Sequence, residues 1–149
     1  MTLKQKVHQR YLQMVNDNIG LLQEDLADLK ESGTHETKST AGDKHETALA
    51  MLQIEQANKR EQLQKVVAQK MVVERINPTI AAPIVVNGSL IKTDKDYLFI
   101  SVALGKAVVE GITFTALSPQ SPLGKELMGL KAGDTATFNN KRYYIESIE

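Results

Sequence analysis

Apolar residues in the first half of the chain recur with the three-and-four spacing of a heptad repeat. They are Leu12, Val15, Ile19, Leu22, Leu26 and Leu29, followed by Leu49, Leu52, Leu63 and Val66. A narrow apolar stripe of this kind is typical of a coiled-coil seam and differs from the broader apolar face of a globular helix. The pattern therefore predicts two long helices, over about residues 3–30 and 43–76.

Residues 31–42 separate the two predicted helices. This segment is small and polar and contains Gly33 and Gly42, which is typical of a loop. If the helices fold back on each other, one antiparallel register brings their apolar residues together. In that register Ile19 faces Lys59. We therefore expect an antiparallel helical hairpin with a loop at its end.

The pattern changes near Asn77. All four prolines and six of the seven aromatic residues lie beyond this position, and apolar runs there alternate with turn signals. We expect strands over residues 89–93, 97–104, 107–117, 134–138 and 142–148. The pair Asn139 and Asn140 predicts a hairpin turn, and Ser121 followed by Pro122 predicts the start of a short helix.

Together these elements predict an α+β protein with two parts. Residues 1–77 form the antiparallel coiled coil, and residues 78–149 form a small antiparallel sheet covered by one short helix. The candidate core residues of the second part are Leu90, Phe99, Val102, Val108, Phe114, Leu123, Leu127, Phe138, Tyr143 and Ile145.

Composition narrows the class of protein. A chain of 149 residues is long enough for one ordinary domain or two small ones, which excludes a large multidomain enzyme. Its 18 basic and 18 acidic residues balance, so the whole molecule has no net attraction for nucleic acid or an anionic membrane. Without cysteine it has no disulfide or thiol nucleophile, and no apolar run suggests a signal peptide or membrane span. We expect a cytoplasmic protein.

Acidic residues gather at the far end of the predicted hairpin. Between Asp17 and Glu46 there are eight acids and three lysines. Asp43 and Glu46 stand three positions apart at the start of the second helix, which places them on the same side of it. A helix start also uses such a pair for its own stability, the first carboxylate capping amide groups and the second reaching back. The alternative is that the pair holds a hard cation such as Mg²⁺ together with ligands from a partner.

Two motifs match the pattern of a known family. The family pattern Gly-Asp-x-x-Glu-x-Ala is met by Gly42, Asp43, Glu46 and Ala48. A second pattern, Ser-x-x-Ser-Pro followed by an apolar residue, Gly, a Leu-rich turn and Gly-Asp, is met by Ser118, Ser121, Pro122, Leu123, Gly124, Leu127, Met128, Gly133 and Asp134. With both motifs in this order, nearly the whole chain resembles the bacterial Gre transcript cleavage factors, which are GreA- and GreB-like transcription elongation factors.

The resemblance implies an N-terminal antiparallel coiled coil and a C-terminal FKBP-like domain. That domain would dock on RNA polymerase at the rim of the secondary channel, and the docking residues would be Ser118, Ser121, Pro122, Leu123 and Gly124. The coiled coil would bring Asp43 and Glu46 to the active centre, where they would share the polymerase's Mg²⁺ and act on the 3′ end of nascent RNA.

The resemblance also implies what the protein is not. It would be a cofactor of transcript hydrolysis by RNA polymerase and not an enzyme by itself. It would hold no Mg²⁺ when free and would not bind DNA directly.

The chain also departs from the family pattern. After Glu46 the family continues Asn-Ala-Glu-Tyr, whereas this chain has Thr-Ala-Leu-Ala. The predicted acidic tip loop, over about residues 31–46, is longer, and Glu126 occupies a position that is usually small. Two alternatives therefore stay open. One is a regulator or inhibitor that occupies the secondary channel without cleavage, and the other is a coiled-coil adapter or chaperone in which Asp43 and Glu46 only cap a helix.

Overall fold

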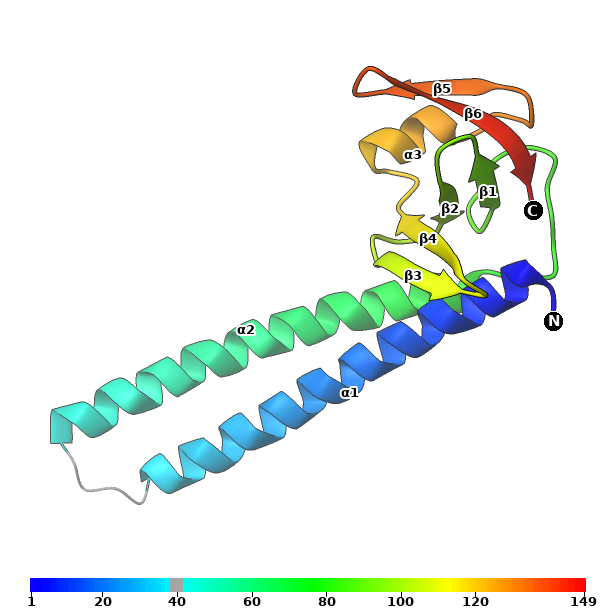
Figure 1. Cartoon of the computed structure of the whole chain (residues 1–149). Coiled ribbons are helices and arrows are strands. Elements are labelled where there is room, and N and C mark those ends of the chain that lie inside the picture. The colour runs from blue at the N-terminus through cyan, green and yellow to red at the C-terminus, as the bar shows by residue number, and fades with distance from the viewer. Residues whose placement is uncertain (38–41) are drawn as a thin grey trace. The chain divides into compact units, whose positions relative to one another are not determined.

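The computed structural model describes the backbone of residues 1–37 and 42–149 and the side chains of residues 1–33 and 46–149. Two long helices are followed by a sheet and a short helix (Figure 1). The helices are α1 (Leu3–Thr37), α2 (Gly42–Arg75) and α3 (Pro122–Leu127). The strands are β1 (Leu90–Thr93), β2 (Tyr97–Ile100), β3 (Gly105–Val109), β4 (Ile112–Leu117), β5 (Thr135–Phe138) and β6 (Lys141–Ile148). This order confirms the predicted α+β class.

The chain divides into two compact units. The sheet unit comprises residues 1–13 and 71–149, and the hairpin unit comprises residues 14–70. The first turns of α1 and the last residues of α2 therefore belong with the sheet. The change from helix to strand falls between Arg75 and Leu90.

In the hairpin unit α1 and α2 run side by side (Figure 1). Helix α1 continues to Thr37, whereas the sequence predicted a loop from residue 31. Gly33 inside a helix costs only about 1 kcal/mol relative to alanine, and residues 31–37 contain no proline that would end the helix. Residues 42–46 of the predicted tip loop belong to α2, and residues 38–41 lie outside the described residues.

The pairing of the two helices differs from the predicted register. Oδ2 of Asp25 lies 3.2 Å from Nζ of Lys59 across the hairpin, where Ile19 was expected to face Lys59. Asp25 lies six positions beyond Ile19, so the predicted register was wrong. A repeating apolar seam permits such an error because it offers similar apolar faces at more than one offset.

The sheet has six strands within the described part of the chain, in the order β3-β4-β2-β1-β6-β5. All neighbouring strands are antiparallel except β2 and β4, which run parallel from the pair Tyr97 and Phe114 to the pair Ile100 and Leu117. The parallel pair arises because the chain moves from β2 out to the edge strand β3, and the β3–β4 hairpin then returns beside β2. The sequence predicted an antiparallel sheet and did not indicate this crossover.

Two tight hairpins shape the sheet. The single strand expected over residues 107–117 is two strands, because Glu110 and Gly111 both have positive φ, at 52° and 77°. Two successive residues with positive φ are typical of the tight turn that joins antiparallel strands. The predicted turn between β5 and β6 is confirmed, since Asn139 and Asn140 have φ of 51° and 62°.

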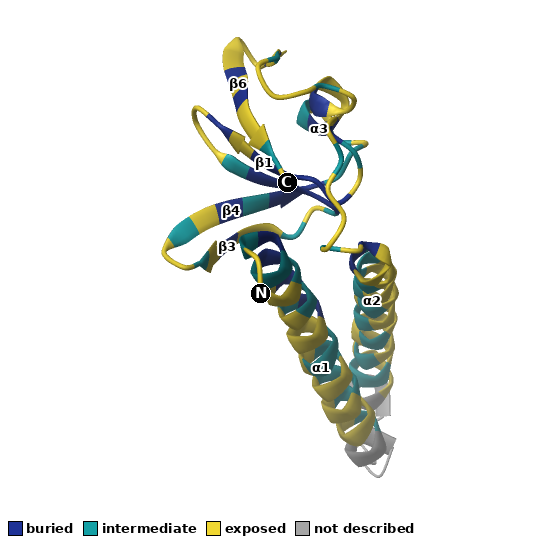
Figure 2. Cartoon of the chain, turned by 90° about the vertical axis from the view of Figure 1, so that its right-hand side faces the viewer, coloured by how far each residue is buried: buried dark blue, intermediate teal, exposed yellow. Residues whose placement is uncertain are grey.

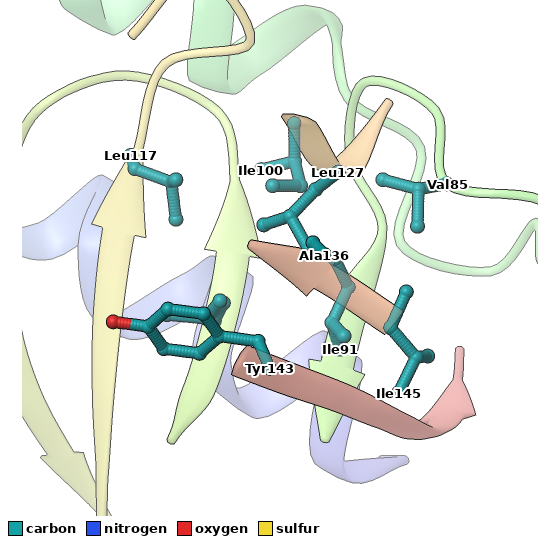
Figure 3. Packing of buried hydrophobic residues seen from close by; sticks show 9 residues of the cluster. Val85, Ile91, Ile100, Leu117, Leu127, Ala136, Tyr143 and Ile145 are labelled. Carbon is teal, nitrogen blue, oxygen red and sulfur yellow. The ribbon is translucent and has the colours of Figure 1, made fainter. Parts of the chain in front are cut away.

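One face of the sheet packs under α3 to form the main apolar cluster (Figure 3). The cluster consists of Val85, Ile91, Leu98, Ile100, Leu117, Leu127, Ala136, Tyr143 and Ile145, with Leu123 and Phe138 packed against it. Most of the predicted core is confirmed, but Val108 is 60% exposed. It lies on the edge strand β3, where its neighbour Ala107 points inward because side chains alternate along a strand.

The start of α1 carries a second set of buried residues in the sheet unit. Val7 and Tyr11 are fully buried, as are Phe99 on β2 and Phe114 on β4. Buried segments at the start of α1 and on β4 are dark blue in Figure 2. Phe99 alternates with Leu98 and Ile100 of the α3 cluster, so β2 is buried on both of its faces.

Candidate functional site

The two predicted tip acids lie at the start of α2. Asp43 is the second residue of the helix, and its side chain is outside the described residues. Glu46 is exposed. Positions 43 and 46 are almost one helical turn apart and therefore lie on the same side of α2. The helix begins at Gly42, so Asp43 lies within its first turn.

The two acids by themselves offer few of the ligands that a bound Mg²⁺ needs. Carboxylate oxygens are the ligands that Mg²⁺ prefers, but Mg²⁺ takes six ligands in octahedral geometry. Among the side chains that the structure describes, no group of three or more His, Asp or Glu residues could hold a metal ion. Two carboxylates alone fill only part of such a coordination shell.

The predicted docking motif forms a tight turn before α3. The hydroxyl of Ser121 donates to the carbonyl oxygen of Ser118 at 2.6 Å and accepts from the amide of Gly124 at 3.1 Å. Ser121 is therefore the N-cap of α3, and Pro122 occupies the first turn, as predicted.

Gly124 is fixed by close packing in the same turn. A Cβ at this position would lie 2.1 Å from the carbonyl oxygen of Ser118. Leu123 packs against the α3 cluster, whereas Pro122 is exposed. The serines and the glycine of the motif thus have local structural roles, and the exposed surface that they support is the part available to a partner.

Tyr11 is a structural anchor that the sequence analysis did not single out. Its hydroxyl lies 2.8 Å from the carbonyl oxygen of Gly105 and 3.1 Å from that of Phe114. Burial raises the pKa of Tyr11 to about 12, an effect only partly opposed by backbone hydrogen bonds and by Arg10. The residue links the first turns of α1 to β3 and β4.

Lys4 is a second residue that the sequence analysis missed. It is 6% exposed, and its Nζ donates to the carbonyl oxygen of Ile80 at 2.7 Å. Burial lowers the pKa of Lys4, and the charge of Glu149 partly offsets this shift. The signal was its helical phase, because Lys4 precedes the buried Val7 and Tyr11 by three and seven positions.

Comparison with models of protein families found no match for this chain, and comparison with curated proteins found none either. Among solved structures, the chain is similar to the GreA factor homolog 1 (Gfh1) protein of Thermus thermophilus, with 17% identity, coverage of 95% of this chain and 94% of that chain, and a TM-score of 0.34. A second structure, of the transcription factor Gfh1, gives 17% identity, coverage of 95% and 92%, and a TM-score of 0.34. At these values the similarity carries no conclusion about the family or function of this chain.

The two long helices are too polar to be membrane spans. Over the described residues, neither contains an apolar stretch sufficient to cross a lipid bilayer.

Proposed function

We propose that this protein is a transcription elongation factor that binds RNA polymerase and stimulates the cleavage of backtracked RNA. The observation that carries the proposal is the placement of Asp43 and Glu46 one turn apart at the beginning of an unbroken 34-residue helix. Such a helix is roughly 50 Å long, and its partner α1 runs beside it in a slender hairpin. A hairpin of this kind suits the delivery of two carboxylates into a narrow channel.

The role of the two acids follows from their chemistry. Asp43 and Glu46 would supply two oxygen ligands, and the polymerase would supply the others. Mg²⁺ bound in this way would polarise a phosphate oxygen of the RNA and help to generate the attacking hydroxide. In this role the protein would act as a cofactor of the polymerase, which would provide the rest of the metal site.

The second motif supports the proposed docking of the sheet unit on the polymerase. The capped turn holds Ser118, Ser121 and Gly124 in one arrangement through two hydrogen bonds, and it leaves no space for a Cβ at position 124. This turn presents Pro122 to solvent next to the half-buried Leu123. A rigid turn loses little conformational entropy on binding, which is what a docking surface requires.

Substitution of the two acids tests the proposal. Wild type, Asp43→Asn, Glu46→Gln and the control Glu55→Gln, an exposed acid of α2, would be added to backtracked complexes of the cognate polymerase. Asparagine caps a helix about as well as aspartate, so Asp43→Asn removes a charged ligand and leaves the helix start intact. We expect Asp43→Asn and Glu46→Gln to bind the polymerase but not to stimulate cleavage, while Glu55→Gln stimulates it like wild type.

The other outcomes separate the alternatives. If Asp43→Asn stimulates cleavage as well as wild type, the acids only stabilise the helix and the proposed mechanism is wrong. If wild type binds and competes with a cleavage factor but does not stimulate cleavage, the protein is a regulator that occupies the channel, which the Thr-Ala-Leu-Ala sequence after Glu46 favours. If it does not bind the polymerase, the adapter interpretation is favoured.

A further inference from the structure

A cavity in the sheet unit lies where the start of α1, the end of α2 and the following segment meet. It has a volume of about 220 Å³, and its polar lining includes Lys4, Arg75, Asn77 and Asn87. The other lining residues are apolar or glycine, and none of the described residues that line the cavity is an acid. The cavity therefore combines two cations with two carboxamides in a chain whose total charge is zero.

Lys4 is the buried cation of this cavity. Its ammonium group has three N–H donors, and the hydrogen bond to the carbonyl oxygen of Ile80 uses one of them. Among the described residues, no carboxylate lies within ion-pair distance of its Nζ, and Glu149 acts on it only through longer-range charge. A buried ammonium with unused donors is unfavourable unless a counter-charge approaches it.

The carboxamide oxygen of Asn77 is already hydrogen-bonded. This Oδ1 atom accepts from the amide and the hydroxyl of Thr79, at 3.0 and 2.5 Å. The oxygen is occupied by these two contacts, so the NH₂ group is the part of the side chain that remains for a ligand. With Lys4 and Arg75, the cavity has donors from two distant segments of the chain and is suited to an anion with several acceptor oxygens.

The end of α2 opposes an anion, but only weakly. The carbonyl end of a helix acts as roughly half a negative charge. Lys4 and Arg75 contribute two full positive charges to the same cavity. The sum of these charges is positive, so the cavity favours an anion.

We propose that this cavity is an oxyanion site that takes a phosphate group, either as free phosphate or as part of a nucleotide. Arg75 binds phosphate oxygens through its planar guanidinium group, and Lys4 supplies a buried positive charge. The NH₂ group of Asn77 donates a further hydrogen bond to a phosphate oxygen. A volume of 220 Å³ is several times that of one water molecule, which leaves room for a phosphate group with attached water. This site is independent of the acids on the hairpin and of RNA polymerase.

The test is a titration of the full-length ¹⁵N-labelled protein with sodium phosphate, with a nucleoside diphosphate and with sodium chloride at equal ionic strength. We expect phosphate or the diphosphate, but not chloride, to shift the amide signals of Gly88 and the side-chain signals of Asn77 in a saturable way. If only the diphosphate does so, the phosphate comes from a nucleotide. If both bind equally well, a phosphate group alone is sufficient.

Variants decide whether the proposed residues form the site. Arg75 is exposed, so Arg75→Gln should fold normally and weaken binding about tenfold or more, the effect of losing one charge-assisted hydrogen bond. Lys4→Met should weaken it similarly, and Lys125→Met, which removes an exposed charge on α3, should have no effect. The proposal is overturned if no anion gives saturable shifts. It is also overturned if Arg75→Gln binds like wild type.

Discussion

The ring of Tyr11 on α1 stacks on the ring of Phe99 on β2, with centroids 5.7 Å apart and planes inclined by 20°. Both side chains are fully buried, and the Tyr11 hydroxyl reaches the carbonyl oxygens of Gly105 and Phe114. The first turns of α1 are therefore an integral part of the sheet unit. This relationship explains why the compact units do not separate at the change from helix to strand.

The raised pKa of Tyr11 predicts a loss of stability at alkaline pH. Its pKa is about 12 in the folded protein, against 10 for an ordinary tyrosine. The folded state therefore holds this proton more tightly than the unfolded state, so the stabilisation is complete below pH 10 and is lost as the pH rises towards 12. The free energy of unfolding should fall by on the order of 2 kcal/mol across this range through Tyr11 alone.

Tyr11→Phe isolates this contribution. The variant lacks the titrating group but keeps the ring, so the difference between its pH profile and that of wild type belongs to Tyr11. Chemical denaturation followed by circular dichroism at several alkaline pH values gives both profiles. Parallel profiles for the two proteins would contradict the assignment.

The register of the hairpin can be measured by cysteine crosslinking. The chain has no cysteine of its own, so each introduced pair is unique. Asp25→Cys with Lys59→Cys should crosslink readily with a short bifunctional thiol reagent, because the ends of the native side chains meet across the hairpin. Ile19→Cys with Lys59→Cys, which tests the register predicted from sequence, should react slowly. If the pair at positions 19 and 59 reacts faster than the pair at positions 25 and 59, the register predicted from the sequence is correct.

Two glycine substitutions should have opposite effects on stability. Gly124→Ala places a Cβ 2.1 Å from the carbonyl oxygen of Ser118, so the turn must move, at a cost of about 1–3 kcal/mol or more. Gly20→Ala, inside α1, meets no atom within 4 Å and should stabilise the hairpin by about 0.5–1 kcal/mol. Thermal or urea denaturation measures both changes. A neutral Gly124→Ala would show that the turn has room for a side chain.

The sequence predicted the elements of the fold better than their pairing. The spacing from Leu12 to Leu29 indicated a helical seam, but a repeating seam leaves the register undetermined, and the ion pair of Asp25 with Lys59 shows a different one. Similarly, the Glu110-Gly111 turn was missed because the residues around it are apolar and β-prone, like a continuous strand. Pairing depends on contacts between distant segments, which local patterns do not contain.

In the candidate sites, too, local features could be predicted from the sequence, whereas contacts between distant segments could not. Ser121 and Pro122 were recognised because capping is a local rule, and the structure confirms the cap. Lys4 and Arg75 are more than seventy positions apart, and nothing in the sequence indicated that they line one cavity. The role of Asp43 and Glu46 stays a prediction, since it depends on a partner.

The most direct test of the central claim is whether the start of α2 reaches the RNA in the polymerase active centre. Ala50 is exposed and about one turn beyond Glu46, so Ala50→Cys provides a unique thiol for a photoactivated crosslinker. In backtracked complexes, this probe should crosslink to the 3′ end of the RNA, whereas the same probe at Thr137→Cys, on the exposed side of β5, should not. Binding to the polymerase without any crosslink from position 50 to the RNA would contradict the delivery of Asp43 and Glu46 to the active centre.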